Sequence, residues 1–100
     1  MITLKNPDQI AKMRRAGHVL EEIVEAICLE VKPGVTTKHL SQLADRMIRK
    51  AGAVPSFLGY QGFPDSLCTS VDTAVVHGIP NGHPLQEGSI IGLDCGLILD

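Results

Sequence analysis

The chain has 100 residues, of which 44% are hydrophobic and 20% charged, and this composition excludes a disordered or fibrous protein and predicts one small globular domain. Its formal net charge of -2 gives no electrostatic reason to read nucleic acid, and no run of about 18 apolar residues could span a bilayer. Residues 1–10 are polar and interrupted by Pro7, so they lack the apolar core of a signal peptide, and we expect a cytoplasmic protein without membrane contact.

Two amphipathic helices are predicted in the first half of the chain. Asn6-Pro7 is a typical helix start, and apolar residues then recur at helical spacing until Lys32-Pro33-Gly34 ends the pattern. This first stripe consists of Ile10, Met13, Leu20, Ile23, Val24, Ile27 and Val31. Thr36 or Thr37 caps a second, shorter helix that ends near Ala51-Gly52. The second stripe consists of Leu40, Leu43, Ala44, Met47, Ile48 and Ala51.

From Val54 onward the composition changes, because glycine and proline punctuate short apolar segments in the way that is typical of strands joined by turns. We predict strands over Leu67 to Val71, Thr73 to Gly78 and Ser89 to Leu99. No repeat or linker separates the helices from the strands, so all of them are expected to share one core. The predicted fold class is α/β (α+β), with two amphipathic helices packed on a mainly antiparallel sheet.

Asp94 is a candidate for chemistry because it interrupts the apolar run from Ile90 to Leu99. The run predicts that Asp94 is buried, where an unpaired carboxylate pays a desolvation cost, so it needs a cation or hydrogen-bond donors. Hard divalent ions prefer oxygen ligands, and Asp94 is therefore a candidate metal ligand. The alternative is a structural carboxylate bonded to backbone amides or to a basic side chain.

His77 is a second candidate, because it ends a predicted strand directly before Gly78-Ile79-Pro80. Glycine lets a ligand approach closely and proline fixes the exit of the chain, so the imidazole could lie at the rim of a cleft. A histidine in that place can donate a hydrogen bond, shuttle a proton or bind a metal. The alternative is a surface-turn histidine without a role.

Phe57, Tyr60 and Phe63 are the only aromatic residues of the chain, and they gather in one loop rich in glycine and proline. Such clustering favours a pocket wall, since binding sites are mostly apolar and are often built on loops. The alternative is a loop that folds its own aromatic side chains inward.

The cysteines Cys28, Cys68 and Cys95 are odd in number, widely spaced and free of any CxxC pattern. This pattern supports neither a disulfide framework nor a zinc ribbon, so we expect three reduced thiols. Cys28 falls in the first helical pattern and is expected to pack there as an apolar side chain.

Four segments of the chain closely resemble the type I methionine aminopeptidases. They are LGYQGFP at 58–64, SLCTSV at 66–71, VVHGIP at 75–80 and GLDCG at 92–96. The resemblance extends back through Pro7 to Arg15, Val31-Lys32-Pro33-Gly34 and Thr36, and so covers essentially the whole chain. The combination of LGY, GFP and HGIP is far more specific than any one of these motifs.

The resemblance implies the pita-bread fold, in which two related halves of an α/β domain enclose a site that usually holds two divalent ions of Co, Mn, Fe, Zn or Ni. It implies that Asp94 is the first of the metal ligands. It also implies that His77 contacts the substrate near the scissile peptide and helps to stabilise the transition state. A monovalent cation is implied at backbone carbonyls around Asp72 and Ala74.

The pocket for the substrate's methionine side chain is implied at Tyr60, Phe63 and Cys68, with Phe57 as a further substrate-binding residue. At Phe63 many relatives carry tyrosine, and at Phe57 some carry cysteine, so the shape of the pocket is expected to differ from theirs. The aromatic and sulfur-lined pocket suits methionine, because thioethers make favourable contacts with aromatic rings.

The implied function is removal of the N-terminal methionine from nascent proteins by metal-dependent peptide hydrolysis. The implied partners are a peptide or nascent protein N-terminus with its initiator methionine and the ribosome, and the full-length protein is expected to be monomeric. The family's other aspartate, histidine and glutamate ligands are not in this sequence. We therefore expect residues 1–100 to be the N-terminal part of a methionine aminopeptidase catalytic domain, truncated after Asp100, and to be inactive alone.

Two other functions fit the same fold. A relative that has lost its metal ligands could act as a metal-free binding module, although His77 and Asp94 argue against this. A metallopeptidase of the same fold that acts at proline is the other alternative, and the loop from Gly59 to Phe63 together with HGIP favours the methionine enzyme over it.

Overall fold

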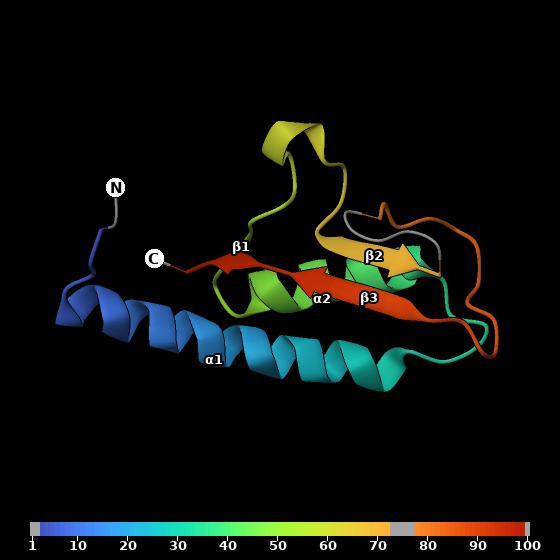
Figure 1. Cartoon of the computed structure of the whole chain (residues 1–100), viewed down its shortest axis with the longest axis horizontal. Helices are drawn as coiled ribbons and strands as arrows, with labels where there is room; N and C mark the ends of the chain where they lie inside the picture. The colour runs from blue at the N-terminus through green and yellow to red at the C-terminus, as the bar shows by residue number, and fades with distance from the viewer. Residues whose placement is uncertain (1–2, 73–77, 100) are drawn as a thin grey trace.

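The computed structural model of the chain describes residues 3–72 and 78–99. Its elements are helix α1 (Pro7–Glu30), helix α2 (Thr37–Lys50), strand β1 (Val54–Pro55), the short 3-10 helix η1 (Tyr60–Gly62), and strands β2 (Leu67–Val71), β3 (Ile91–Cys95) and β4 (Leu97–Ile98). Helices α1 and α2 cover one side of the strands, and the loop that carries η1 rises on the other side (Figure 1).

Helix α1 begins where the sequence predicts. The Asn6 side chain accepts a hydrogen bond from the Gln9 amide, and the Gln9 side chain accepts one from the Asn6 amide, both at 2.8 Å. This capping box satisfies two backbone donors at the helix start, while Pro7 at the first helical position has no amide hydrogen to lose. The helix ends at Glu30, ahead of Pro33, so both predicted boundaries are confirmed.

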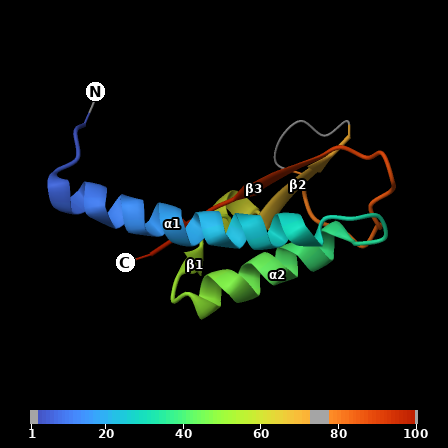
Figure 2. The ribbon, with the colours of Figure 1, turned by 90° about the horizontal axis from the view of Figure 1, so that it is seen from below.

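The apolar stripe of α1 is buried only in its second half. Ile23 and Ile27 are buried in the core, whereas Ile10 and Met13 are 46% and 57% exposed. The reason is the packing of the two helices, which lie close together near the turn that joins them and diverge away from it (Figure 2). The first half of α1 extends past the end of α2, so α2 does not cover it.

Helix α2 is capped by Thr36, whose hydroxyl oxygen accepts a hydrogen bond from the His39 amide at 3.0 Å. It ends ahead of Gly52, which takes up the left-handed backbone conformation with φ 82° that suits glycine after a helix. Leu40, Ala44 and Ile48 are completely buried, as their spacing predicts. Ala51, the last member of the predicted stripe, is exposed because it lies in the turn beyond the helix.

The strands form two antiparallel pairs. Strand β2 has the predicted bounds and pairs with β3, so that Leu67 lies opposite Cys95. The single strand predicted over 89–99 is wrong in detail, because it is divided at Gly96 into β3 and β4. Strand β1 was not expected and pairs with β4. Of the strand predicted over 73–78, residues 73–77 lie outside the described residues.

The loop between β1 and β2 begins and ends beside the same segment of the chain, which is residues 91–98. Val54 pairs with Ile98 in β4, and Leu67 pairs with Cys95 in β3. Both ends of the intervening loop, residues 56–66, are therefore attached to residues 91–98. We call residues 56–64 the aromatic loop, because they contain Phe57, Tyr60 and Phe63.

One hydrophobic core lies between the helices and the strands. It consists of Ile23, Ile27, Leu40, Ala44, Ile48, Ala53, Leu67 and Leu85, with half-buried side chains from β3 and β4 around it. The predicted class, two helices packed on an antiparallel sheet, is confirmed. Within residues 3–72 and 78–99, no helix is both long and apolar enough to cross a membrane.

Candidate substrate pocket and metal ligand

A cavity of about 440 Å³ lies under the aromatic loop. Its lining residues are Phe57, Tyr60, Gln61, Gly62, Phe63, Pro64, Cys68 and Ile79. The structure therefore brings together the predicted substrate-binding residues of the loop and Cys68 of β2. His77, the remaining predicted substrate-binding residue, lies outside the described residues. The volume is within the range of about 300–1,000 Å³ that is usual for small-ligand sites.

The aromatic loop is held in shape by its own backbone. The Gly59 amide donates to the Phe63 carbonyl at 2.8 Å, and the Phe63 amide donates to the Tyr60 carbonyl at 3.0 Å. Gly59 and Gly62 have φ values of 81° and 80°, which glycine adopts without steric cost. Gln61 has a φ of 49° in the same turn, where its Cβ is less favourable. The loop is thus a compact turn that carries three aromatic side chains.

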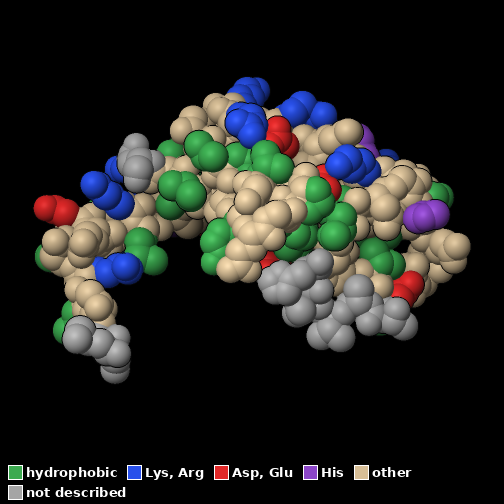
Figure 3. Space-filling model, turned by 90° about the horizontal axis from the view of Figure 1, so that it is seen from above, with side chains coloured by type: hydrophobic (Ala, Val, Ile, Leu, Met, Phe, Trp, Pro, Cys, Tyr) green, Lys and Arg blue, Asp and Glu red, His purple; other side chains and the backbone are tan. Residues whose placement is uncertain are grey.

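The aromatic rings of the loop pack on each other and also face the cavity. The rings of Phe57 and Phe63 are 6.4 Å apart at an interplanar angle of 76°, which is the favourable edge-to-face arrangement. Both side chains are half-buried, whereas Tyr60 is 66% exposed and lies at the cavity's outer edge. Hydrophobic side chains are exposed across the middle of the face that carries this loop, and several basic side chains follow one edge (Figure 3).

Cys68 connects the cavity to the predicted metal ligand. It is 2% exposed and lies directly opposite Asp94 in the β2–β3 pair. Directly opposed residues of an antiparallel pair point to the same face of the sheet, with Cβ atoms about 4.5–5.5 Å apart. The carboxylate of Asp94 is therefore next to the residue that lines the cavity from β2.

The prediction that Asp94 is buried in an apolar run is wrong. Along β3 exposure alternates, so that Ile91, Leu93 and Cys95 are half-buried toward the helices, and Gly92 and Asp94 are exposed on the other face. The alternation between buried and exposed positions is hard to see in the sequence, because Gly92 is the only residue between Ile90 and Asp94 that lacks an apolar side chain. The carboxylate is thus accessible to an ion from solvent, and no burial cost forces it to have a partner.

The two thiols of the sheet are kept neutral. Burial raises the pKa of the Cys68 thiol, and the negative charge of Asp94 raises it further. Burial and then Asp94 raise the pKa of Cys95 to about 11. Neither thiol is ionised at neutral pH, so both act as uncharged side chains. The three cysteines are free, as predicted, but Cys28 is exposed rather than packed.

Gly78, which follows His77 in the sequence, is hydrogen-bonded to β2. The Thr69 amide donates to the Gly78 carbonyl at 2.9 Å, and the Gly78 amide donates to the Ser70 hydroxyl at 3.2 Å. A Cβ atom at residue 78 would overlap the Thr69 carbonyl oxygen and lie 2.9 Å from the Ser70 Cα. Only glycine permits this approach, and the next residue, Ile79, lines the cavity.

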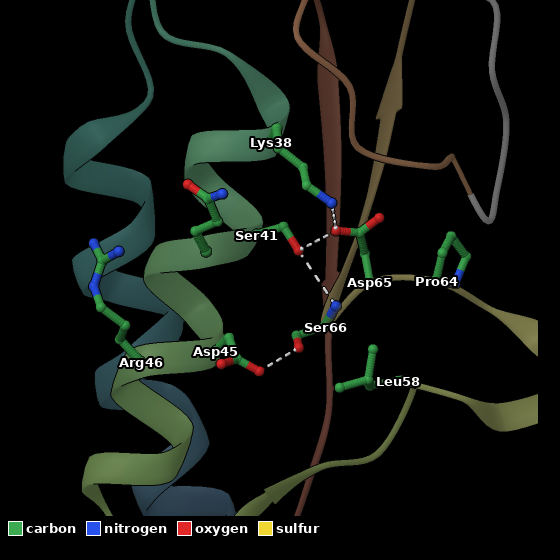
Figure 4. A pocket seen from close by; sticks show the side chains of 9 residues that line it. Lys38, Ser41, Asp45, Arg46, Leu58, Pro64, Asp65 and Ser66 are labelled. Atoms are coloured by element: carbon green, nitrogen blue, oxygen red, sulfur yellow. Dashed lines mark hydrogen bonds and ion pairs between the residues drawn. The ribbon is translucent and has the colours of Figure 1, made fainter.

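Between α2 and the end of the aromatic loop lies a cluster of polar side chains that the sequence analysis did not predict. Lys38 Nζ and Ser41 Oγ donate to Oδ1 of buried Asp65 at 2.6 Å and 3.3 Å. Ser41 Oγ also accepts from the Ser66 amide at 3.3 Å, and Ser66 Oγ donates to Asp45 Oδ1 at 2.7 Å (Figure 4). We call these five residues the polar cluster. They line a second cavity of about 560 Å³.

The helical half of the polar cluster is visible in the sequence. Lys38, Ser41 and Asp45 recur at the spacing of one helix face, beside the buried stripe of α2. Burial raises the pKa of Asp45, but the Ser66 hydroxyl and the Arg49 guanidinium together lower it more, so its pKa lies below the usual value. Nothing in the helix itself identifies Asp65 and Ser66 as the partners.

Comparison with known proteins places this geometry in a family. Residues 11–100 match the sequence model of metallopeptidase family M24. The chain belongs to this family. Family M24 relatives include the methionine aminopeptidase of Clostridium acetobutylicum, 50% identical over 101 residues, and methionine aminopeptidase 1 of Bacillus subtilis, 45% identical over 100 residues. Each alignment covers the whole of this chain and 40% of the relative, so the chain spans about 40% of the length of these curated relatives.

Solved structures agree with family M24. The methionine aminopeptidase of Rickettsia prowazekii superimposes with a TM-score of 0.96 at 42% identity, over 99% of this chain and 40% of that one. The enzyme of Thermotoga maritima superimposes with a TM-score of 0.93 at 32% identity, over 98% of this chain and 40% of that one. The expected pita-bread architecture is thereby confirmed for the segment that this chain covers.

A metallopeptidase of family M24 uses a metal, and the described side chains supply only part of a site for it. Among residues 3–72 and 78–99, no three His, Cys, Asp or Glu side chains come together in the way that a metal site needs. Asp94 fits as one ligand, because it is an exposed carboxylate on a strand and presents the oxygen atoms that hard divalent ions prefer.

The expected monovalent-cation site around Asp72 and Ala74 is described only in part. Asp72 has a φ of 51°, its amide donates to the Ile90 carbonyl at 2.7 Å, and its carboxylate accepts from the Ile90 amide at 2.9 Å. These bonds hold the end of β2 on the chain that enters β3. Ala74 lies outside the described residues.

Proposed function

We propose that residues 1–100 form the N-terminal part of the catalytic domain of a methionine aminopeptidase, which removes the N-terminal methionine from nascent proteins by metal-dependent hydrolysis. The observation that carries the proposal is the cavity lined by Phe57, Phe63 and Cys68, with Asp94 directly opposite Cys68 on the adjoining strand. The names of the family M24 relatives support it.

The cavity suits the side chain of methionine. An unbranched thioether can enter a narrow apolar space and make sulfur contacts with the rings of Phe57 and Phe63. Cys68 adds an uncharged sulfur to the wall, because its pKa is raised. Substrates with a charged first side chain are excluded, since the cavity offers no described charge to pair with them.

The pairing of β2 and β3 supports a position for the reacting end of the substrate beside Asp94. A methionine side chain that lies over Cys68 brings the peptide bond it carries toward the carboxylate of Asp94, because the two residues face the same side of the sheet. Asp94 would hold a divalent metal, which supplies an activated water and a Lewis acid when bound. His77 is proposed, on the resemblance alone, to donate a hydrogen bond to the substrate near the scissile carbonyl.

Several finer assignments belong to the same proposal. Two divalent ions are expected per site, drawn from Co, Mn, Fe, Zn or Ni, and a monovalent cation is expected near Asp72. The substrate is the N-terminus of a nascent chain, so a cytoplasmic location and association with the ribosome are expected. The full-length protein is expected to be a monomer.

The test uses the complete protein, stripped of metal with a chelator and reloaded with one divalent metal at a time. We expect release of methionine from a Met-Ala-Ser peptide that depends on added metal. Asp94→Asn is expected to lose more than about 100-fold in kcat/KM, since even the outer partners of metal ligands are worth about 10–100-fold. Glu25→Gln, at an exposed position of α1, is the control and is expected to retain full activity.

Three results would contradict the proposal. If an X-Pro peptide is cleaved in preference to the methionyl peptide, the protein is the proline-directed enzyme. If no metal binds in equilibrium dialysis and no peptide is cleaved, it is a binding module. If Asp94→Asn binds metal and cleaves as the unaltered protein does, Asp94 is not a ligand.

A further inference from the structure

We infer that Asp65 is a positioning residue, which holds the aromatic loop against α2 through the polar cluster and thereby sets how sharply the pocket selects the substrate's first side chain. The selectivity part of this inference rests on the proposed function. The anchoring part rests on contacts of the described chain alone.

The aromatic loop depends on its two ends. Within it, the described backbone hydrogen bonds of residues 57–63 all have both partners in the same turn. At the first end, the Ser56 amide donates to the Gly96 carbonyl at 3.2 Å. At the second end, Asp65 and Ser66 are bound by side chains of α2. The described hydrogen bonds that attach the turn to the rest of the chain are therefore at its two ends.

The second attachment is built around a buried charge. Asp65 is 6% exposed, and Lys38 and Ser41 both donate to its Oδ1. Burial of a carboxylate is costly unless it is paired and hydrogen-bonded, so Asp65 is stable in this place only while α2 supplies its donors. The adjoining buried stripe of α2 is fixed in the core by Leu40 and Ala44, which makes the helix a rigid support.

Pro64 transmits the attachment to the pocket. It directly precedes Asp65 and lines both the cavity under the aromatic loop and the cavity of the polar cluster. Proline has a fixed φ, so a shift of Asp65 is passed on to Phe63 with little loss. Phe63 lines the pocket and supports the ring of Phe57. Ser66 connects the polar cluster to the pocket on the C-terminal side of Asp65, because Leu67 and then Cys68, which lines the pocket, follow it in the chain.

The cluster permits a charge-swap test. Ser41 can donate to a carboxylate or accept from an ammonium group, since a hydroxyl does both. Asp65→Lys brings a second cation to Lys38, and Lys38→Asp brings a second carboxylate to Asp65. The double variant restores an ion pair with the two charges exchanged, so that the carboxylate is at position 38 and the ammonium group at position 65, both beside the Ser41 hydroxyl. Asp65→Asn is a milder variant that keeps the side-chain shape if the charge reversals impair folding.

The first readout is selectivity, measured as kcat/KM of the complete metal-loaded protein for methionyl, norleucyl and alanyl peptides. Each single variant is expected to lower the preference for methionyl over alanyl peptide by about tenfold, the value of one well-placed pocket contact. The double variant is expected to recover most of that preference. Glu21→Lys, which breaks the exposed His18–Glu21 contact of 3.9 Å on α1, is the control and leaves the preference unchanged.

The second readout does not depend on activity. Hydrogen–deuterium exchange of the peptide that covers residues 57–63 is expected to be faster in each single variant and to return toward normal in the double variant. Amides of α1 around Ile23 are expected to stay protected throughout, because they belong to the core.

The outcomes separate the two proposals. If the single variants melt at a lower temperature but keep both the preference and the exchange of the loop, Asp65 is merely structural and the inference fails. It also fails if the double variant recovers neither quantity. If the unaltered protein releases no methionine with any metal, the proposed function fails, and the exchange experiment still decides whether Asp65 anchors the loop.

Discussion

Gly96 leaves the space that the ring of Phe57 fills. A Cβ atom at residue 96 would lie 3.4 Å from Cζ of Phe57 and would overlap the hydroxyl oxygen of Ser56. The ring in turn packs edge-to-face on Phe63, with 6.4 Å between the centroids. The absence of a side chain at residue 96, between β3 and β4, therefore leaves room for a ring that lines the pocket.

Enlarging residue 96 should narrow the pocket in proportion to the added volume. Gly96→Ala is expected to have a small effect, because the Ser56 hydroxyl can rotate away and 3.4 Å is close to an ordinary contact. Gly96→Val should push the Phe57 ring into the cavity and lower kcat/KM for a methionyl peptide by more than about tenfold. Peptide-release kinetics with the complete protein measure both. Gly17→Val, at a position with open space around it, is the matched control.

Gly78→Ala should destabilise the protein. The added methyl group meets the backbone of Thr69 and Ser70, which cannot rotate away, so we expect a loss of about 1–3 kcal/mol in the free energy of unfolding. Urea denaturation followed by circular dichroism measures it. Gly82→Ala is the control, because a Cβ there meets nothing within 4 Å. Equal stability of the two variants would mean that the contact between Gly78 and β2 does not form.

Alkylation should distinguish the cysteines. Cys28 is exposed on α1, whereas Cys68 is 2% exposed and its pKa is raised by burial and by Asp94. Because iodoacetamide reacts with the thiolate, we expect Cys28 to be modified first at pH 8 and Cys68 only after unfolding in urea. Peptide mass spectrometry identifies the modified residue. Rapid modification of native Cys68 would show that the floor of the pocket is open to solvent.

Two leucines give a direct measure of the core. Leu40 is completely buried between α2 and the strands, and Leu29 is 85% exposed near the end of α1. Leu40→Ala is expected to cost about 2–5 kcal/mol of unfolding free energy, and Leu29→Ala less than about 0.5 kcal/mol. Thermal and urea denaturation of both variants of the complete protein provide the comparison. A large cost at Leu29 would reveal a further contact on that face of α1.

The elements that local sequence signals define were predicted well. Asn6-Pro7 and Thr36 mark the two helix starts by capping chemistry that involves only neighbouring residues. Strand β2 has the predicted bounds, because its β-branched and apolar residues lie between turn signals. The gathering of the aromatic residues around a cavity likewise follows from their closeness in the sequence.

The features that depend on distant partners were not predictable in the same way. Strand β1 has two residues and exists only through its pairing with β4. The strand is divided at Gly96, where a side chain would meet Ser56 and Phe57, and Asp94 is exposed on the face of β3 that the helices do not cover. Asp65 finds its donors on α2, and no local pattern shows which helix face it will meet.

The pairing of β1 and β2 with the single segment 91–98 has a consequence for how the protein can change. Because the sheet and the polar cluster hold the two ends of the aromatic loop, we expect substitutions within residues 57–63 to alter the walls of the cavity without moving the strands. Asp94 is held by the pairing of β2 and β3 and not by this loop. A different preference for the substrate's first side chain could therefore evolve, or be engineered, through changes confined to residues 57–63 of the aromatic loop.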